Sequence, residues 1–137
     1  MHPYTIKQFN ISGEPIPEDV ADKIVRYHMY PVWDVALEFK AYPSDNSSYR
    51  SVKWEKSKGR SGNSQHTFKG KGATDWTCEY FDNKKEELLK SLIENTDYIR
   101  FAVYNTFIHC DYKDTHNGKR LVFESDSSSN WTFIKFV

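Results

Sequence analysis

The stretch YIRFAVYNTFIHCDY, residues 98–112, carries the strongest signal for the fold class of this chain. It consists of two short runs, 98–105 and 106–112, that are rich in aromatic and β-branched residues. Such runs are typical of β-strands, because their side chains fit the pleated surface of a sheet. The stretch therefore predicts two consecutive strands.

Two further strands are expected downstream. The runs RLVFES (120–125) and WTFIKFV (131–137) have the same composition, and the polar run 125–130 between them reads as a loop. Asn117-Gly118 is a strong signal for a tight hairpin turn, because both positions of such a turn need a positive φ. The C-terminal third is therefore expected to be antiparallel sheet.

A helix should precede these strands. Asn83 followed by Glu86 resembles a capping box, and the helical pattern ends near Asn95. The residues at helical spacing that form one apolar face are Leu88, Leu89, Leu92 and Ile93.

The N-terminal part also has a helical pattern, over 15–39, which Pro31 should break to leave a second segment over 32–39. Residues 43–65 are polar and rich in serine and glycine, and their composition predicts a long loop. The predicted fold is α+β, a single domain over 1–137 in which helices pack on an antiparallel sheet.

Composition limits the classes of function. The chain has 137 residues, with 19 basic and 19 acidic side chains that cancel, which argues against nucleic acid or an anionic membrane as a partner held by bulk charge. No stretch is apolar enough to span a membrane, and residues 1–20 lack the features of a signal peptide. The two cysteines, Cys78 and Cys110, could pair once, but so few favour a reducing compartment.

Strand alternation places candidate ligands together. In a strand over 106–112, His109 and Asp111 share one face. With His66 and Asp75, which lie in the glycine-rich segment 61–76, His109 suggests a set of two histidines and one carboxylate. Such a set suits Zn²⁺ and leaves a fourth position open for water, whose pKa the metal lowers. A packed or exposed histidine is the alternative for His109. The other histidines, which lack comparable context, are His2, His28 and His116.

Three blocks carry a family resemblance. SSYRS (47–51), GNSQHTFKGKGATDW (62–76) and FIHCDY (107–112) resemble, in order, the signature blocks of the zinc D-alanyl-D-alanine carboxypeptidase-like metallopeptidases. That family includes the VanY and VanX type peptidases and the L-alanyl-D-glutamate endopeptidases of phages. The stretch 11–39 also resembles the helical lead-in of the family, so that the resemblance extends over nearly the whole chain.

The resemblance implies a fold and a site. The fold would be of the Hedgehog/D-Ala-D-Ala peptidase type, with zinc on the open sheet face. His66, Asp75 and His109 would be the zinc ligands. Arg50 would act in catalysis and substrate binding, by holding a substrate carboxylate or polarising an oxyanion, and Ser64 would help to position substrate. A surface arginine and a turn serine are the alternatives.

Two positions depart from the family pattern. Nine positions separate His66 from Asp75, where the commonest motif has seven. Many members carry an acid three residues before the last histidine, where this chain has Thr106. Asp111 is the nearest carboxylate able to serve as the catalytic base. It could equally orient His109 or pair with a basic neighbour.

The implied activity is zinc-dependent hydrolysis of peptidoglycan stem peptides by a soluble monomer without membrane insertion. The expected location is the cytoplasm of the producing cell, with release through a holin or carriage on a virion in the case of a phage lysis protein. A cytoplasmic dipeptidase fits as well. Two alternatives stay open: a non-catalytic zinc-containing wall-binding or glycan-binding module on the same scaffold, and an interaction protein without metal.

Overall fold

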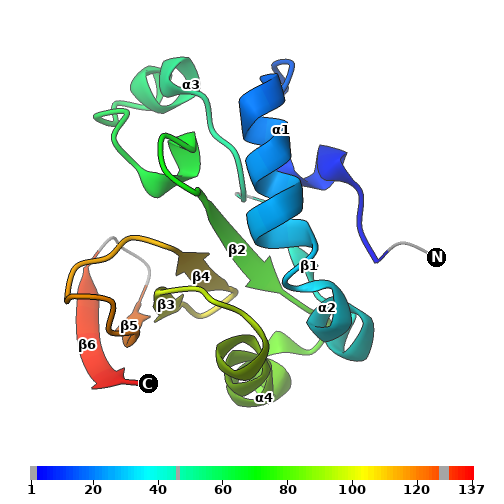
Figure 1. Ribbon diagram of the computed structural model, residues 1–137, viewed down its shortest axis with the longest axis vertical. Helices are drawn as coiled ribbons and strands as arrows, with labels where there is room; N and C mark the ends of the chain where they lie inside the picture. The colour runs from blue at the N-terminus through cyan, green and yellow to red at the C-terminus, as the bar shows by residue number, and fades with distance from the viewer. Residues whose placement is uncertain (1–2, 46, 127–129) are drawn as a thin grey trace.

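The computed structural model describes residues 3–45, 47–126 and 130–137. Within these ranges the chain forms an α+β fold, as predicted, with four α-helices and one six-stranded sheet (Figure 1). The helices are α1 (Glu18–Ile24), α2 (Trp33–Phe39), α3 (Val52–Ser57) and α4 (Phe81–Asn95). The strands are β1 (Tyr42–Pro43), β2 (Ala73–Thr77), β3 (Arg100–Val103), β4 (Ile108–Asp111), β5 (Leu121–Ser125) and β6 (Trp131–Phe136).

The sheet is mixed, so the prediction of an antiparallel sheet is wrong in this respect. Its strand order is β1-β2-β4-β3-β5-β6, and neighbouring strands are antiparallel except for β3 and β5, which are parallel. Both edges of β4 are occupied, by β2 and β3, so that β5 pairs with the remaining edge of β3. Asn117 and Gly118 do form a tight turn at positive φ, but it lies in the connection between β4 and β5, which are not neighbours.

One face of the sheet carries the hydrophobic core. Trp76 on β2, Phe101 on β3, and Ile108 and Cys110 on β4 are fully buried there. Ile24, from α1, belongs to the same core. Because side chains alternate along each strand, Asp75, His109 and Asp111 project from the opposite face. The predicted alternation along 106–112 therefore describes the two faces of β4 correctly.

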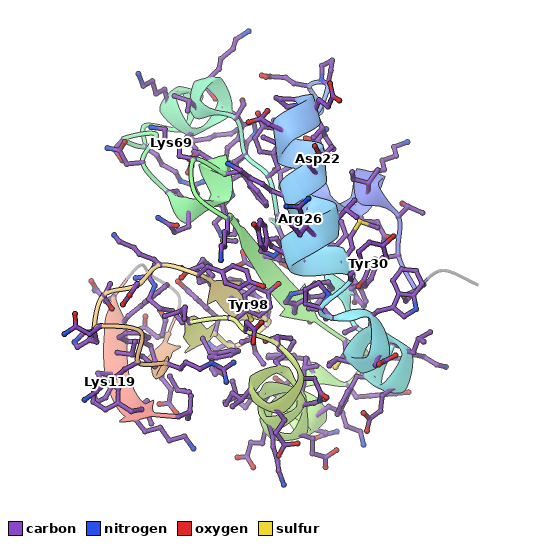
Figure 2. The ribbon with its side chains drawn as sticks, in the orientation of Figure 1. Asp22, Arg26, Tyr30, Lys69, Tyr98 and Lys119 are labelled. Carbon is purple, nitrogen blue, oxygen red and sulfur yellow. The ribbon has the colours of Figure 1, made fainter. Side chains whose placement is uncertain are left out.

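The N-terminal helix changes its geometry before the predicted break. After α1, residues Val25–Met29 form a π-helical turn, η2, and α2 begins after Pro31. Figure 2 shows Asp22 on α1, Arg26 on η2 and Tyr30 directly after η2, following one another down the helical segment. His28, inside η2, is fully buried and its Nδ1 lies 2.7 Å from the hydroxyl of Tyr98. Burial lowers the pKa of His28 to about 3, so the imidazole is neutral and serves the core.

The long loop predicted for 43–65 is wrong in part, because α3 lies inside it. Ser51 caps this helix by accepting a hydrogen bond from the backbone N–H of Trp54, at 3.0 Å. The helix is six residues long and has no apolar period, so hydrophobic patterning could not reveal it. The capping box predicted at Asn83 is also wrong: α4 begins at Phe81, after Tyr80, with no side-chain cap.

Two further predictions concern the cysteines and membrane-spanning helices. Cys78 and Cys110 are both buried and unpaired with each other. No helix in the described ranges has the length and apolar character needed to cross a bilayer.

Candidate metal centre

The centre begins with a cross-strand pair. Asp75 on β2 and His109 on β4 are direct neighbours in the antiparallel register. Side chains in that relation lie on one face and within contact of each other. The Nδ1 atom of His109 lies 3.0 Å from Oδ1 of Asp75, and both residues are buried. The sheet itself therefore places the histidine and the carboxylate side by side.

His66 approaches from a separate element. It lies in the short 3-10 helix η3 (Gln65–Thr67), which Ser64 caps by accepting a hydrogen bond from the His66 N–H at 3.1 Å. The His66 Nδ1 lies 2.7 Å from the backbone oxygen of Ser48, which accepts its hydrogen. This leaves Nε2 directed at the carboxylate, 3.4 Å from Oδ1 of Asp75.

The segment that joins His66 to Asp75, nine positions further on, forms a loop against the core. Phe68 turns its ring into the core and is almost fully buried. Gly72 lies against this ring with φ +88°, where a Cβ would come within 2.1 Å of a ring carbon. Only glycine fits this combination of backbone angle and close approach. The longer spacing is therefore accommodated by a loop that is anchored by Phe68.

The three side chains form a compact donor set. His66, Asp75 and His109 each offer one ligand atom within 4.8 Å of the others, and the hydrogen bonds identify these atoms as His66 Nε2, Asp75 Oδ1 and His109 Nδ1. In each histidine the second ring nitrogen is engaged elsewhere. That arrangement fixes the tautomer and the ring orientation, as metal sites require. Two imidazoles and a carboxylate are ligands that Zn²⁺ accepts, and non-haem Fe(II) accepts the same set.

Asp111 lies behind His109. Its Oδ2 is 2.7 Å from His109 Nε2, and Arg100 donates to both of its oxygens, at 2.9 and 2.6 Å. The backbone N–H of Lys113 is a further donor, at 3.0 Å. With both oxygens engaged and the side chain fully buried, the geometry favours the orienting role for Asp111 over proton transfer. Arg100 was not recognised from the sequence, because its role depends on its position opposite Asp111 in the β3–β4 register.

Charge is concentrated around His109. Burial alone would lower the pKa of His109, but its hydrogen bonds to Asp111 and Asp75 raise it to about 9. Burial would likewise raise the pKa of Asp75, yet the adjacent histidines His66 and His109 hold it well below its usual range. Without a metal, the centre is thus held together by protons shared between carboxylates and imidazoles. A cation that displaced them would meet an ionised carboxylate.

Arg50 and Ser64 lie beside the donor set. The Arg50 backbone N–H donates to the His66 carbonyl at 2.8 Å, and its guanidinium lies 3.7 Å from Oδ2 of Asp75. Both residues line a cleft of about 880 Å³ that also contains His66, Asp75 and His109. Ser64 acts as the cap of η3, the turn role left open by the sequence, while it borders the same cleft.

An aromatic wall borders the other side of this cleft. Tyr104 and Phe107 stack with centroids 4.5 Å apart, and the indole of Trp131 donates to the Tyr104 hydroxyl at 2.8 Å. The Trp131 ring lies 5.1 Å from the His109 ring. These residues come from the β3–β4 turn and from β6, so that no local sequence pattern would group them. Thr106 lies in the same turn and is exposed, and as a threonine it offers no carboxylate there.

Comparisons of the chain with protein-family models, with curated protein sequences and with solved structures find no match. The resemblance to the zinc D-alanyl-D-alanine carboxypeptidase-like family therefore stays a prediction that rests on the three sequence blocks.

Proposed function

We propose that this protein is a zinc-dependent peptidase that hydrolyses peptidoglycan stem peptides, at D-Ala-D-Ala or L-Ala-D-Glu type bonds. The observation that carries the proposal is the donor set of His66, Asp75 and His109, buried in a cleft beside an arginine. The kind of bond comes from the resemblance alone.

Peptide hydrolysis needs an activated nucleophile, an electrophile for the carbonyl oxygen, and a route for protons. A bound zinc ion would supply the first two, by lowering the pKa of a water molecule and by acting as a Lewis acid. His66 and His109 would hold it through Nε2 and Nδ1, with Ser48 and Asp111 fixing the two rings from behind. Asp75 would supply the ligand that carries negative charge.

Arg50 is the substrate-binding and catalytic residue in this proposal. Its guanidinium borders the cleft next to Asp75, where it can hold a substrate carboxylate or stabilise negative charge that develops on the carbonyl oxygen. Ser64, at the start of η3, is placed to contact the same substrate.

Proton transfer is the step for which the site offers the fewest suitable side chains. Asp111 is engaged by Arg100 and His109, and we assign it to orienting His109. A positioned general base contributes roughly 10²- to 10⁴-fold to such reactions. We therefore expect slow turnover in comparison with family members that have an acid at the position of Thr106.

The same observation favours a second candidate, a non-catalytic zinc-containing module that binds cell-wall peptides or glycans. The aromatic wall of Tyr104, Phe107 and Trp131 beside the donor set offers a surface for stacking. In this case the wall would be bound and no bond would be cut.

Mass spectrometry of purified peptidoglycan and of free stem peptides, incubated with the protein and either zinc or a chelator, separates these candidates. Zinc-dependent products that disappear in His66→Ala but persist in His116→Ala would support the peptidase, because His116 is exposed and lies outside the cleft. Products from the chelator-treated protein or from His66→Ala would contradict it. Zinc-loaded protein that binds the wall without products would favour the binding module.

A further inference from the structure

A second arginine borders the cleft, and it follows α3 in the sequence whereas Arg50 precedes it. Arg60 follows α3, and its side chain is half exposed towards the cleft that contains the donor set. The Arg60 guanidinium lies 5.3 Å from the centre of the Trp54 ring, and that of Arg50 lies 5.8 Å from the same ring. One indole thus holds two guanidinium groups that line one cleft.

A buried carboxylate holds Arg60 in place. Glu55 is fully buried, and its Oε2 accepts a hydrogen bond from Arg60 Nη1 at 3.1 Å. Its other oxygen, Oε1, has no hydrogen-bond partner among the described residues. A buried charge is costly unless it is paired, so Glu55 strongly favours a nearby guanidinium. This pairing leaves most of the Arg60 donors directed away from Glu55, since a guanidinium has five.

We infer that Arg60 is a second carboxylate-binding residue of this cleft, that it determines specificity together with Arg50, and that Glu55 is its positioning residue. The nature of the ligand, a peptide with a free carboxylate, rests on the proposed function. Each guanidinium carries a planar pair of donors that matches the two oxygens of a carboxylate, and both arginines line the same cleft.

Lys58 offers a matched control. Its ammonium lies 5.6 Å from the centre of the same Trp54 ring, yet Lys58 does not line the cleft. Lys58→Gln removes one positive charge at the same indole, as Arg60→Gln does. Any effect of general charge is therefore shared by both variants, and any effect of the subsite is confined to Arg60.

The test is an NMR titration of the zinc-loaded protein with N-acetyl-D-alanyl-D-alanine and with its C-terminal amide. The Trp54 indole N–H signal, identified with Trp54→Phe, reports binding near the arginines. The wild-type protein should bind the acid more tightly than the amide. Arg60→Gln should weaken binding of the acid by about tenfold, the value of one charge-assisted hydrogen bond. Binding of the amide should stay within about twofold, and Lys58→Gln should resemble the wild type.

Two further variants separate positioning from folding. Glu55→Gln/Arg60→Gln removes both members of the ion pair, so that no buried charge is left unpaired, and it should still bind the acid as weakly as Arg60→Gln. Glu55→Gln should weaken binding of the acid in a folded protein, because Arg60 loses its anchor. Unchanged affinity in Arg60→Gln, an equal loss in Lys58→Gln, or no preference of the wild type for the acid would each overturn the inference.

The same spectra report cleavage through the methyl signals of the ligand. Arg60→Gln could cleave the ligand and still prefer the acid over the amide as strongly as the wild type does. That result would refute the subsite and would not count against the peptidase. Arg60-dependent binding without cleavage would support the subsite and count against cleavage of D-Ala-D-Ala bonds, while the peptidoglycan digest tests the L-Ala-D-Glu type.

Discussion

His109 touches carboxylates through both of its ring nitrogens, Asp75 at Nδ1 and Asp111 at Nε2. A metal ion can bind only one of these two nitrogens, and the other nitrogen then keeps its hydrogen bond to a carboxylate. If the metal takes Nδ1, then Nε2 must carry the hydrogen that Asp111 accepts. The role of Asp111 as an orienting residue is therefore a property of single atoms and can be tested by changing one of them.

Asp111→Asn keeps the shape of the side chain but removes its charge, and it should weaken zinc binding by about 10- to 100-fold, as other losses of such partners do. Turnover should fall along with zinc occupancy and recover with excess zinc. Zinc affinity is measured by competition with a chromogenic chelator. Asp97→Asn, at an exposed position outside the cleft, is the control. Unchanged zinc affinity with lost turnover would instead assign Asp111 to proton transfer.

The pKa of about 9 for His109 predicts how zinc binding depends on pH. Below that pH the metal-free imidazole carries a proton on each nitrogen, and zinc must displace the one on Nδ1. Affinity should therefore rise by about tenfold per pH unit from neutral pH upwards, as release of one proton requires, and should level off once His109 has lost its proton. The chelator competition, repeated from about pH 6.5 to 9.5, measures this slope. A flat profile would show that His109 is already neutral before zinc binds.

At the scale of elements, the loop between η3 and β2 determines whether His66 meets Asp75. Phe68 anchors this loop in the core. Gly72 has no side chain, so the backbone can run close to the Phe68 ring. His66 and Asp75, nine positions apart, meet because the residues between them fold into this anchored loop.

Gly72→Ala should destabilise the protein by about 2 kcal/mol or more, because it combines a strained φ with overpacking against Phe68. The midpoint of urea unfolding measures this loss. Gly70→Ala is the matched control, because a Cβ there would meet only the Gln65 side chain, at 3.8 Å. Gly70→Ala should change the unfolding free energy by less than about 0.5 kcal/mol. Equal effects of the two substitutions would contradict the role of the contact between Gly72 and Phe68.

At the scale of the whole molecule, the donor set joins parts of the chain that are distant in sequence. His66 belongs to η3, Asp75 to β2 and His109 to β4, so that unfolding separates the three ligands. An ion that binds only the assembled set stabilises the folded state by mass action. Zinc should consequently affect the thermal stability of the entire fold.

Free zinc at 100 times its dissociation constant should stabilise the fold by about 2.7 kcal/mol. The melting temperature should rise by several degrees, at about 3 °C per kcal/mol for a chain of this size. Differential scanning calorimetry with zinc and with chelator measures the difference. The rise should vanish in His109→Ala and remain in His116→Ala, which alters an exposed histidine. A rise that persisted in His109→Ala would place the ion elsewhere.

Local patterns predicted the elements of the sheet better than their pairing. The strands around Ile108 and Leu121 and the face shared by His109 and Asp111 follow from composition and alternation, which depend on near neighbours. The helix α3 escaped prediction because Ser51 and Trp54 form it through a cap rather than through an apolar face. The parallel pairing of β3 with β5 also escaped prediction, because it depends on which edges were already occupied.

The candidate site shows the same contrast between features that depend on neighbouring residues and features that depend on distant ones. Composition and alternation predicted the residue types, two histidines and a carboxylate, and the placement of His109 on the polar face of β4. The pairing of Asp75 with His109 and of Arg100 with Asp111 follows from contacts between separate strands of the folded chain. The physical reason is that periodicity is a property of neighbouring residues, whereas register and side-chain pairing depend on distant segments that meet only when the core forms.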